Sequence, residues 1–256
     1  MSKKPKRAKQ YKAQLAQSTR TDVWMSQIEQ QMLMADYTSV INTCQRLLSH
    51  LPQRSLQRAD VLAQLGTAHA LLKNFLESYD AFTEALTITP NEADLWFNRG
   101  MSSRATSRMG QAARDFERAV ELHENGPLAR QFAKELRFSQ KMAQRSVRLR
   151  GPNFTLDQLI EQEECYQQAL KAMQANDWEG AEQALRDTIA MGDCLPQPWG
   201  NLGLCLVMQQ RYDEAEAALK RALEIDRRYM PARINLAALP ETRRSGPPSV
   251  IGVIDP

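Results

Sequence analysis

Small and large apolar positions recur along this chain with a period of about 34 residues. Glycine marks one small position at Gly66, Gly100 and Gly203, and a second small residue follows twelve positions after each glycine. Core-forming side chains come four and seven positions after that second residue, which is the spacing of one helical face. In this register, five copies of the pattern begin at Thr21, Ala59, Ala93, Gln162 and Pro196.

Each copy predicts two antiparallel helices joined by a short turn. The glycine position lies on the first helix and the other small position on the second, so the two helices can cross closely there. A large residue at the start of the second helix follows a short polar stretch that suits a turn. In chain order, this residue is Tyr37, Phe75, Met109, Trp178 and Tyr212. One such pair cannot bury its apolar side alone, so the pattern predicts an all-α stack of helix pairs.

These positions resemble the tetratricopeptide repeat family over residues 21–239, most specifically within residues 65–90, 96–119 and 199–223. The resemblance implies a right-handed α-solenoid of about five helix pairs in which the first helices line a concave inner surface. Proteins of this family bind segments of other proteins on that surface. The resemblance therefore also implies a protein-binding adaptor or assembly factor rather than an enzyme.

The repeat pattern is interrupted at residues 127–161, where Lys134 and Arg150 replace a glycine and a core residue. Residues 127–148 instead predict one amphipathic helix whose apolar side, with Leu128, Phe132 and Leu136, caps the third repeat. Because a break follows this helix at residues 151–153, we expect two lobes. The expected parts are a basic, disordered arm at 1–20, a first lobe with three repeats and the capping helix at 21–149, a second lobe with two repeats and its own capping helix at 150–240, and a flexible tail at 241–256 with an apolar segment at 250–254.

The resemblance also indicates which side chains line the inner surface. Many of them are apolar, and the methionines among them adapt readily to the shape of an apolar ligand. The predicted groove comprises Met25, Leu71, Phe97, Asn98, Met101, Arg104, Tyr166, Leu170, Met173, Asn201, Leu204 and Met208. We expect this groove to bind an apolar helical or extended segment of a partner protein, unless the bend between the lobes or residues 250–254 fill it. Some members of the family bind C-terminal carboxylates through a basic clamp, which this sequence does not match.

The interrupting helix carries a basic stripe on its other side, within an arc of about 80°. The stripe consists of Arg130, Lys134, Arg137, Lys141, Arg145 and Arg148. It can contact phosphates, an acidic protein segment or an anionic membrane surface, or simply be the polar outer face that a capping helix needs. The first twenty residues add seven basic residues and no acidic one. Together, these features indicate an alternative function, that of a nucleic-acid-associated protein.

Composition offers little chemistry for catalysis. The 256 residues carry a formal net charge of +3 and are 43% hydrophobic, which is enough for a substantial core. The four cysteines, Cys44, Cys165, Cys194 and Cys205, form no C-x-x-C motif and are typical of thiols in a reducing compartment. The three histidines have no metal-binding spacing. We therefore expect no catalytic residue, cofactor, metal site or transmembrane segment, and a cytoplasmic protein that is nuclear only if its source is eukaryotic.

Overall fold

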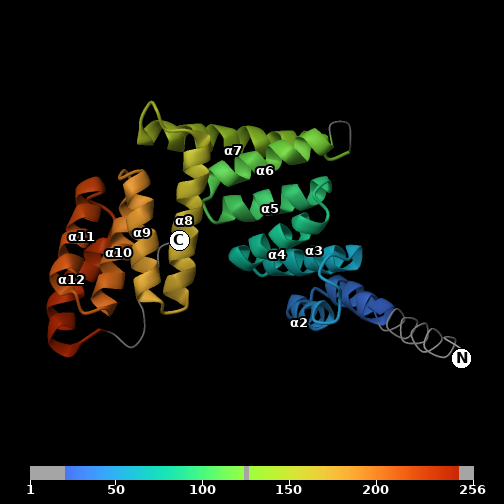
Figure 1. Cartoon of the computed structure of the whole chain (residues 1–256), viewed down its shortest axis with the longest axis horizontal. Coiled ribbons are helices and arrows are strands. Elements are labelled where there is room, and N and C mark those ends of the chain that lie inside the picture. Colours follow the sequence, from blue (N-terminus) through green and yellow to red (C-terminus); the bar gives the residue numbers. More distant parts are fainter. Residues whose placement is uncertain (1–20, 124–126, 248–256) are drawn as a thin grey trace, which may run out of the picture. The chain divides into compact units, whose positions relative to one another are not determined.

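The computed structural model describes residues 21–123 and 127–247, and every regular element within them is an α-helix (Figure 1). A helix at residues 21–33 comes first. It is followed by α2 (Tyr37–Leu48), α3 (Leu56–Leu71), α4 (Phe75–Ile88), α5 (Ala93–Ala105), α6 (Met109–Leu122), α7 (Ala129–Arg150), α8 (Leu156–Gln174), α9 (Trp178–Met191), α10 (Pro196–Met208), α11 (Tyr212–Ile225) and α12 (Met230–Ser245). The predicted all-α class is confirmed.

The helices form consecutive pairs in the predicted register. The helix at residues 21–33 packs with α2, α3 with α4, α5 with α6, α8 with α9, and α10 with α11. The single helix α7 lies where the repeat pattern is interrupted, and α12 packs on α10 and α11. The structure thus contains the stacked helix pairs and the C-terminal capping helix that the sequence predicted.

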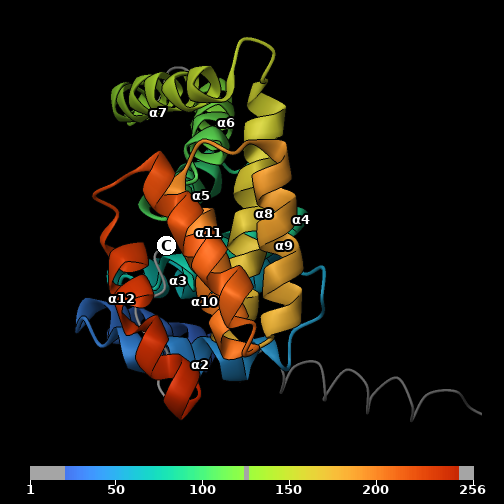
Figure 2. The ribbon, with the colours of Figure 1, turned by 90° about the vertical axis from the view of Figure 1, so that its left-hand side faces the viewer.

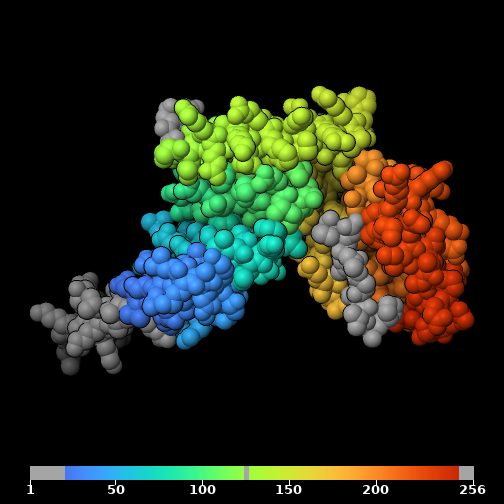
Figure 3. Space-filling model, turned by 180° about the vertical axis from the view of Figure 1, so that it is seen from behind, coloured from blue at the N-terminus to red at the C-terminus, as the bar shows by residue number. Residues whose placement is uncertain are grey.

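The chain divides into two compact units. Within the described residues, the first unit comprises 21–106 and 114–136, and the second comprises 107–113 and 137–247. Figure 3 shows the first unit as bands of colour in chain order from blue to green, and Figures 1 and 2 show α8 and α9 side by side in the second. The sequence placed the boundary near residue 150. The structure instead groups residues 137–150 with the second unit, where Ala143 and Val147 pack with Leu159.

A close crossing of the two helices in a pair explains the glycine positions. A Cβ atom added at Gly66 would lie 2.9 Å from the ring of Phe82, and one at Gly203 would lie 2.6 Å from Leu219. The same relation holds at Gly100. Because a packed interior has no room for contacts this short, each glycine accommodates the large core side chain of the facing helix.

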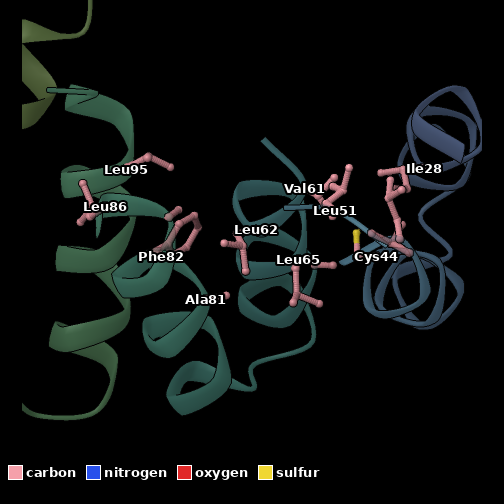
Figure 4. Close-up of a cluster of buried hydrophobic side chains, with 14 residues drawn as sticks. Ile28, Cys44, Leu51, Val61, Leu62, Leu65, Ala81, Phe82, Leu86 and Leu95 are labelled. Atoms are coloured by element: carbon pink, nitrogen blue, oxygen red, sulfur yellow. The ribbon is translucent and has the colours of Figure 1, made fainter. Parts of the chain in front are cut away.

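One core cluster of the first unit extends from its first helix to the start of α5 (Figure 4). Ile28 from the first helix, Cys44 from α2, Leu62 from α3 and Phe82 from α4 each have at most 1% of their surface exposed. Each helix pair therefore buries its apolar side against its neighbour, as expected for repeats that are not stable alone.

The turn inside each helix pair contains one residue with a positive φ. These residues are Ala35, Lys73, Ser107, Asn176 and Gln210, with φ between 55° and 63°. All of them occupy the fifteenth position of the repeat. At the end of α3, the N–H of Asn74 donates to the carbonyl of His69 at 2.8 Å, as in a Schellman motif. The recurrence of this turn supports the repeat register independently of the side-chain pattern.

Glycine at these turn positions is expected to stabilise the protein, because a left-handed backbone costs an L-residue about 1–2 kcal/mol and costs glycine almost nothing. Replacing Gln210 by Gly should raise the free energy of unfolding, measured in urea, by about 1 kcal/mol. The matched control is Gln168→Gly at an exposed position inside α8, which should lower it by about 1 kcal/mol. If both variants raise the free energy of unfolding, or both lower it, the left-handed turn does not have the cost assumed here.

Candidate functional site

The predicted groove residues of the first unit differ widely in exposure. Met25, Asn98, Met101 and Arg104 are half-buried. Leu71 keeps 50% of its surface exposed, whereas Phe97 keeps only 9%. The inner surface of this unit is therefore accessible in the second repeat but largely closed at Phe97 in the third.

Helix α7 closes the inner surface at Phe97. The ring of Phe132 stacks on the ring of Phe97 with a centroid distance of 4.4 Å and an interplanar angle of 17°. Nearby, Arg104 Nη1 donates to Glu135 Oε2 at 2.6 Å. Phe132 and Glu135, on the helix that the sequence predicted to cap the third repeat, thus contact that repeat. Phe97, which the sequence placed in the ligand groove, is mostly buried and forms part of the contact with that helix.

Most predicted groove residues of the second unit also serve its core. Leu170, Met173 and Leu204 are at most 5% exposed and belong to one buried apolar cluster. Asn201, another predicted groove residue, is 3% exposed and donates to the Tyr166 hydroxyl at 2.9 Å. Met208 is half-buried. These contacts explain why family positions alone overestimated the accessible groove.

Four large apolar side chains stand exposed at one end of the first helices in the first unit. Leu33 and Met34 are 89% and 70% exposed, and Leu71 and Leu72 are 50% and 39% exposed. The two pairs occupy equivalent positions of consecutive repeats, 38 residues apart. We call these four residues the apolar edge. The predicted site contained only Leu71 of the four, although the recurrence of a large apolar pair just before the turn could have indicated them all.

The predicted basic stripe lies on the outer side of α7. Arg130, Lys134, Arg137, Lys141, Arg145 and Arg148 are all exposed. None of them forms an ion pair with a carboxylate in the described part of the chain. Phe138 and Leu149, at 47% and 59% exposure, stand on the same helix. The stripe is therefore a row of accessible positive charges.

The thiols offer little nucleophilic chemistry. Burial raises the pKa of the Cys44 and Cys205 thiols to about 12, so both remain protonated at neutral pH. Among the described residues, no cluster of His, Cys, Asp and Glu side chains is suited to hold a metal ion. None of the described helices has the length and hydropathy needed to cross a bilayer.

One carboxylate of the second unit caps a helix of another repeat. Glu163 on α8 accepts hydrogen bonds from the backbone N–H groups of Gly110 (2.9 Å) and Gln111 (3.1 Å) in the first turn of α6. Burial raises the pKa of Glu163 to about 7, although these bonds and the nearby Arg150 act in the opposite direction. The contact involves α6, α7 and α8 and has a structural role.

These features define a class of protein: a repeat protein of stacked helix pairs with a recurring glycine crossing and a recurring left-handed turn. Residues 166–229 match the family model described as tetratricopeptide repeat. That segment extends from within α8 through the whole α10 and α11 pair. This segment is therefore similar to tetratricopeptide repeats, as the sequence resemblance indicated.

Several solved structures are similar to this chain. The TPR2AB domain of yeast Sti1 in its pHSP90 complex is 13% identical, with a TM-score of 0.40 over 88% of this chain and 84% of that one. The TPR domain of P58(IPK) is 12% identical, with a TM-score of 0.46 over 95% and 71%. The MamA protein is 13% identical, with a TM-score of 0.37 over 91% and 98%. No curated protein matches the chain. These comparisons do not support the alternative of a nucleic-acid-associated protein.

Proposed function

We propose that this protein is a non-enzymatic adaptor that binds an apolar segment of a partner protein at the apolar edge of its first unit. The observation that carries the proposal is the exposure of Leu33, Met34, Leu71 and Leu72 at equivalent positions of two consecutive repeats. Contiguous exposed apolar side chains on a protein surface commonly mark an interaction site.

The repeat geometry gives the apolar edge a shape that suits a helix or an extended segment. The first helices of the first two pairs contribute Ile28 and Leu62 to one core cluster, and packed helices lie about 8–10 Å apart. Leu33 and Leu71 end their helices at the same repeat position, so the two apolar pairs lie at the same end of neighbouring helices. A partner helix with apolar anchors about two turns apart, roughly 10 Å, can therefore contact both pairs.

The surface next to the apolar edge supports the same function. Met25 and Met32 on the first helix are half-buried, and both pack against the core cluster of the unit. Their thioether side chains can change rotamer to fit a ligand at little cost. The predicted groove thus remains our proposal for the first two repeats, with Met25 and Leu71 retained and Phe97 excluded.

Four free cysteines support a cytoplasmic location, which we propose with this function. Structural disulfides are common in oxidising compartments and rare in the cytosol. Cys44 and Cys205 are fully buried and serve as small apolar core residues.

The double substitution Leu33→Ser and Leu71→Ser is expected to weaken partner binding by about 30- to 1,000-fold, because interface anchors contribute about 1–2 kcal/mol each. The free energy of unfolding should change little, since both side chains are exposed. Affinity capture from a lysate of the source organism, followed by mass spectrometry and titration of the captured partner, measures the effect.

The matched control is Met230→Ser with Ile234→Ser on α12, where two apolar side chains are 54% and 60% exposed. This control should capture the same partners as the wild type. The proposal fails if the Leu33 and Leu71 variant keeps its partners while the α12 variant loses them, because binding would then belong to the second unit.

A further inference from the structure

We propose that the outer face of α7 in the second unit binds an anionic lipid surface. The site consists of four cations, Arg137, Lys141, Arg145 and Arg148, with three exposed apolar side chains, Phe138, Leu149 and Leu156. We call it the lipid face. It is distinct from the apolar edge and does not depend on the adaptor function proposed above.

The helical positions of the four cations place them on one line. At 100° per residue, they fall within an arc of about 80°, and they extend over about 16 Å of the helix. The opposite side of α7 holds Ala143 and Val147, which pack with Leu159 of α8. Because that side is fixed in the core, the cations have a fixed outward direction.

The charges of the lipid face are not balanced within the described chain. Elsewhere in the second unit, some arginines pair with carboxylates, as Arg211 does with Glu182 and Glu214, whereas the separate exposed residues Arg227, Arg228 and Arg233 do not in the part of the chain that the structure describes. The four cations of the lipid face have no such pair among the described residues. A polar outer face for solubility does not require an excess of one sign, because mixed charges serve as well. The excess of positive charge on the lipid face is therefore complementary to an anionic partner.

The apolar side chains distinguish a membrane from other anionic partners. Phe138 is 47% exposed, Leu149 is 59% exposed and Leu156, at the start of α8, is 37% exposed. Leu149 and Leu156 lie on either side of the connection between α7 and α8, which extends beyond the neighbouring helices in Figures 1 and 2. Side chains of this kind enter the interfacial layer of a bilayer while the adjacent cations contact the headgroups. Binding to the phosphate backbone of a nucleic acid depends on the cations and gains little from the two exposed leucines.

The test measures binding of the full chain to phosphatidylcholine vesicles with and without one third phosphatidylserine, by cosedimentation. Wild type should bind only the anionic vesicles, and more weakly as salt rises. The triple variant Arg137→Gln, Lys141→Gln and Arg145→Gln should bind them about 100-fold more weakly. Each basic residue near such a surface strengthens binding about fivefold. The double variant Phe138→Ser and Leu149→Ser should also bind more weakly.

The matched control removes three other exposed cations of the second unit, through Arg227→Gln, Arg228→Gln and Arg233→Gln. It has the same net charge as the triple variant and should bind like the wild type. Equal binding by the triple variant and the wild type would overturn the proposal, because the basic residues at 1–20 would then account for adsorption. An unaffected Phe138 and Leu149 variant, or equally tight binding to polyglutamate or a short DNA duplex, would also overturn it in favour of a general polyanion site. Circular dichroism and thermal midpoints confirm that each variant is folded.

Discussion

Replacing Asp115 by Ala is expected to lower the free energy of unfolding by about 3–5 kcal/mol, because it leaves a buried guanidinium without its carboxylate. Asp115 on α6 is fully buried, and Arg99 on α5 is 9% exposed. The guanidinium donates twice to this carboxylate, from Nε at 3.0 Å and from Nη2 at 2.6 Å. Its central carbon also lies 4.7 Å from the ring centroid of Trp96. The arginine is held by α5 and cannot easily turn to solvent.

Urea denaturation of two further variants tests the cause of this loss. Arg99→Met combined with Asp115→Ala removes both charges and should recover much of the stability, since an apolar pair leaves no uncompensated charge. Glu121→Ala breaks the exposed pair with Arg118, at 2.8 Å, and should cost less than about 1 kcal/mol. The explanation is wrong if the Asp115 and Glu121 variants lose similar amounts of stability.

The sequence predicted those features of the fold that depend on local periodicity. Gly66 and Gly203 follow from the pattern because the facing core residue always lies sixteen positions further along the same chain, at Phe82 and Leu219. The sequence predicted where the turns lie but not their backbone conformation. Residues such as Lys73 and Gln210 give no sign of a positive φ, because the repeat geometry imposes it against their preference.

The candidate site was harder to predict because it depends on contacts between distant segments. Family positions placed Phe97 and Asn201 on the inner surface, but Phe132 and Tyr166 engage them in the structure. The apolar side of α7 was recognised from its sequence, yet its consequence for Phe97 requires the packed structure. An apolar residue at a helix end can face the core or the solvent, so only the recurrence of Leu33 at the repeat position of Leu71 could have indicated its exposure.

A second large effect concerns pH. The protein is expected to lose about 2 kcal/mol of stability between pH 5 and pH 8 through Glu163 alone. The pKa of this carboxyl is about 7 in the folded chain, above its ordinary value of 4.5. The folded state therefore binds the proton more tightly than the unfolded state does. The contribution of Glu163 to the free energy of unfolding is fully present below pH 4.5 and is lost as the pH rises through 7.

Unfolding free energies of the wild type and Glu163→Gln, measured in urea across that pH range, isolate this contribution. The variant cannot ionise at this position, so its stability should decline less than that of the wild type as the pH rises. Burial lowers the pKa of His69, which favours folding at higher pH, but this effect is present in both proteins and cancels in their difference. Parallel pH profiles for the two proteins would show that the backbone N–H groups of α6 and Arg150 keep Glu163 ionised throughout. In that case the capping of α6 would be a charged contact, strengthened by the positive end of the helix dipole, and it would weaken on acidification instead.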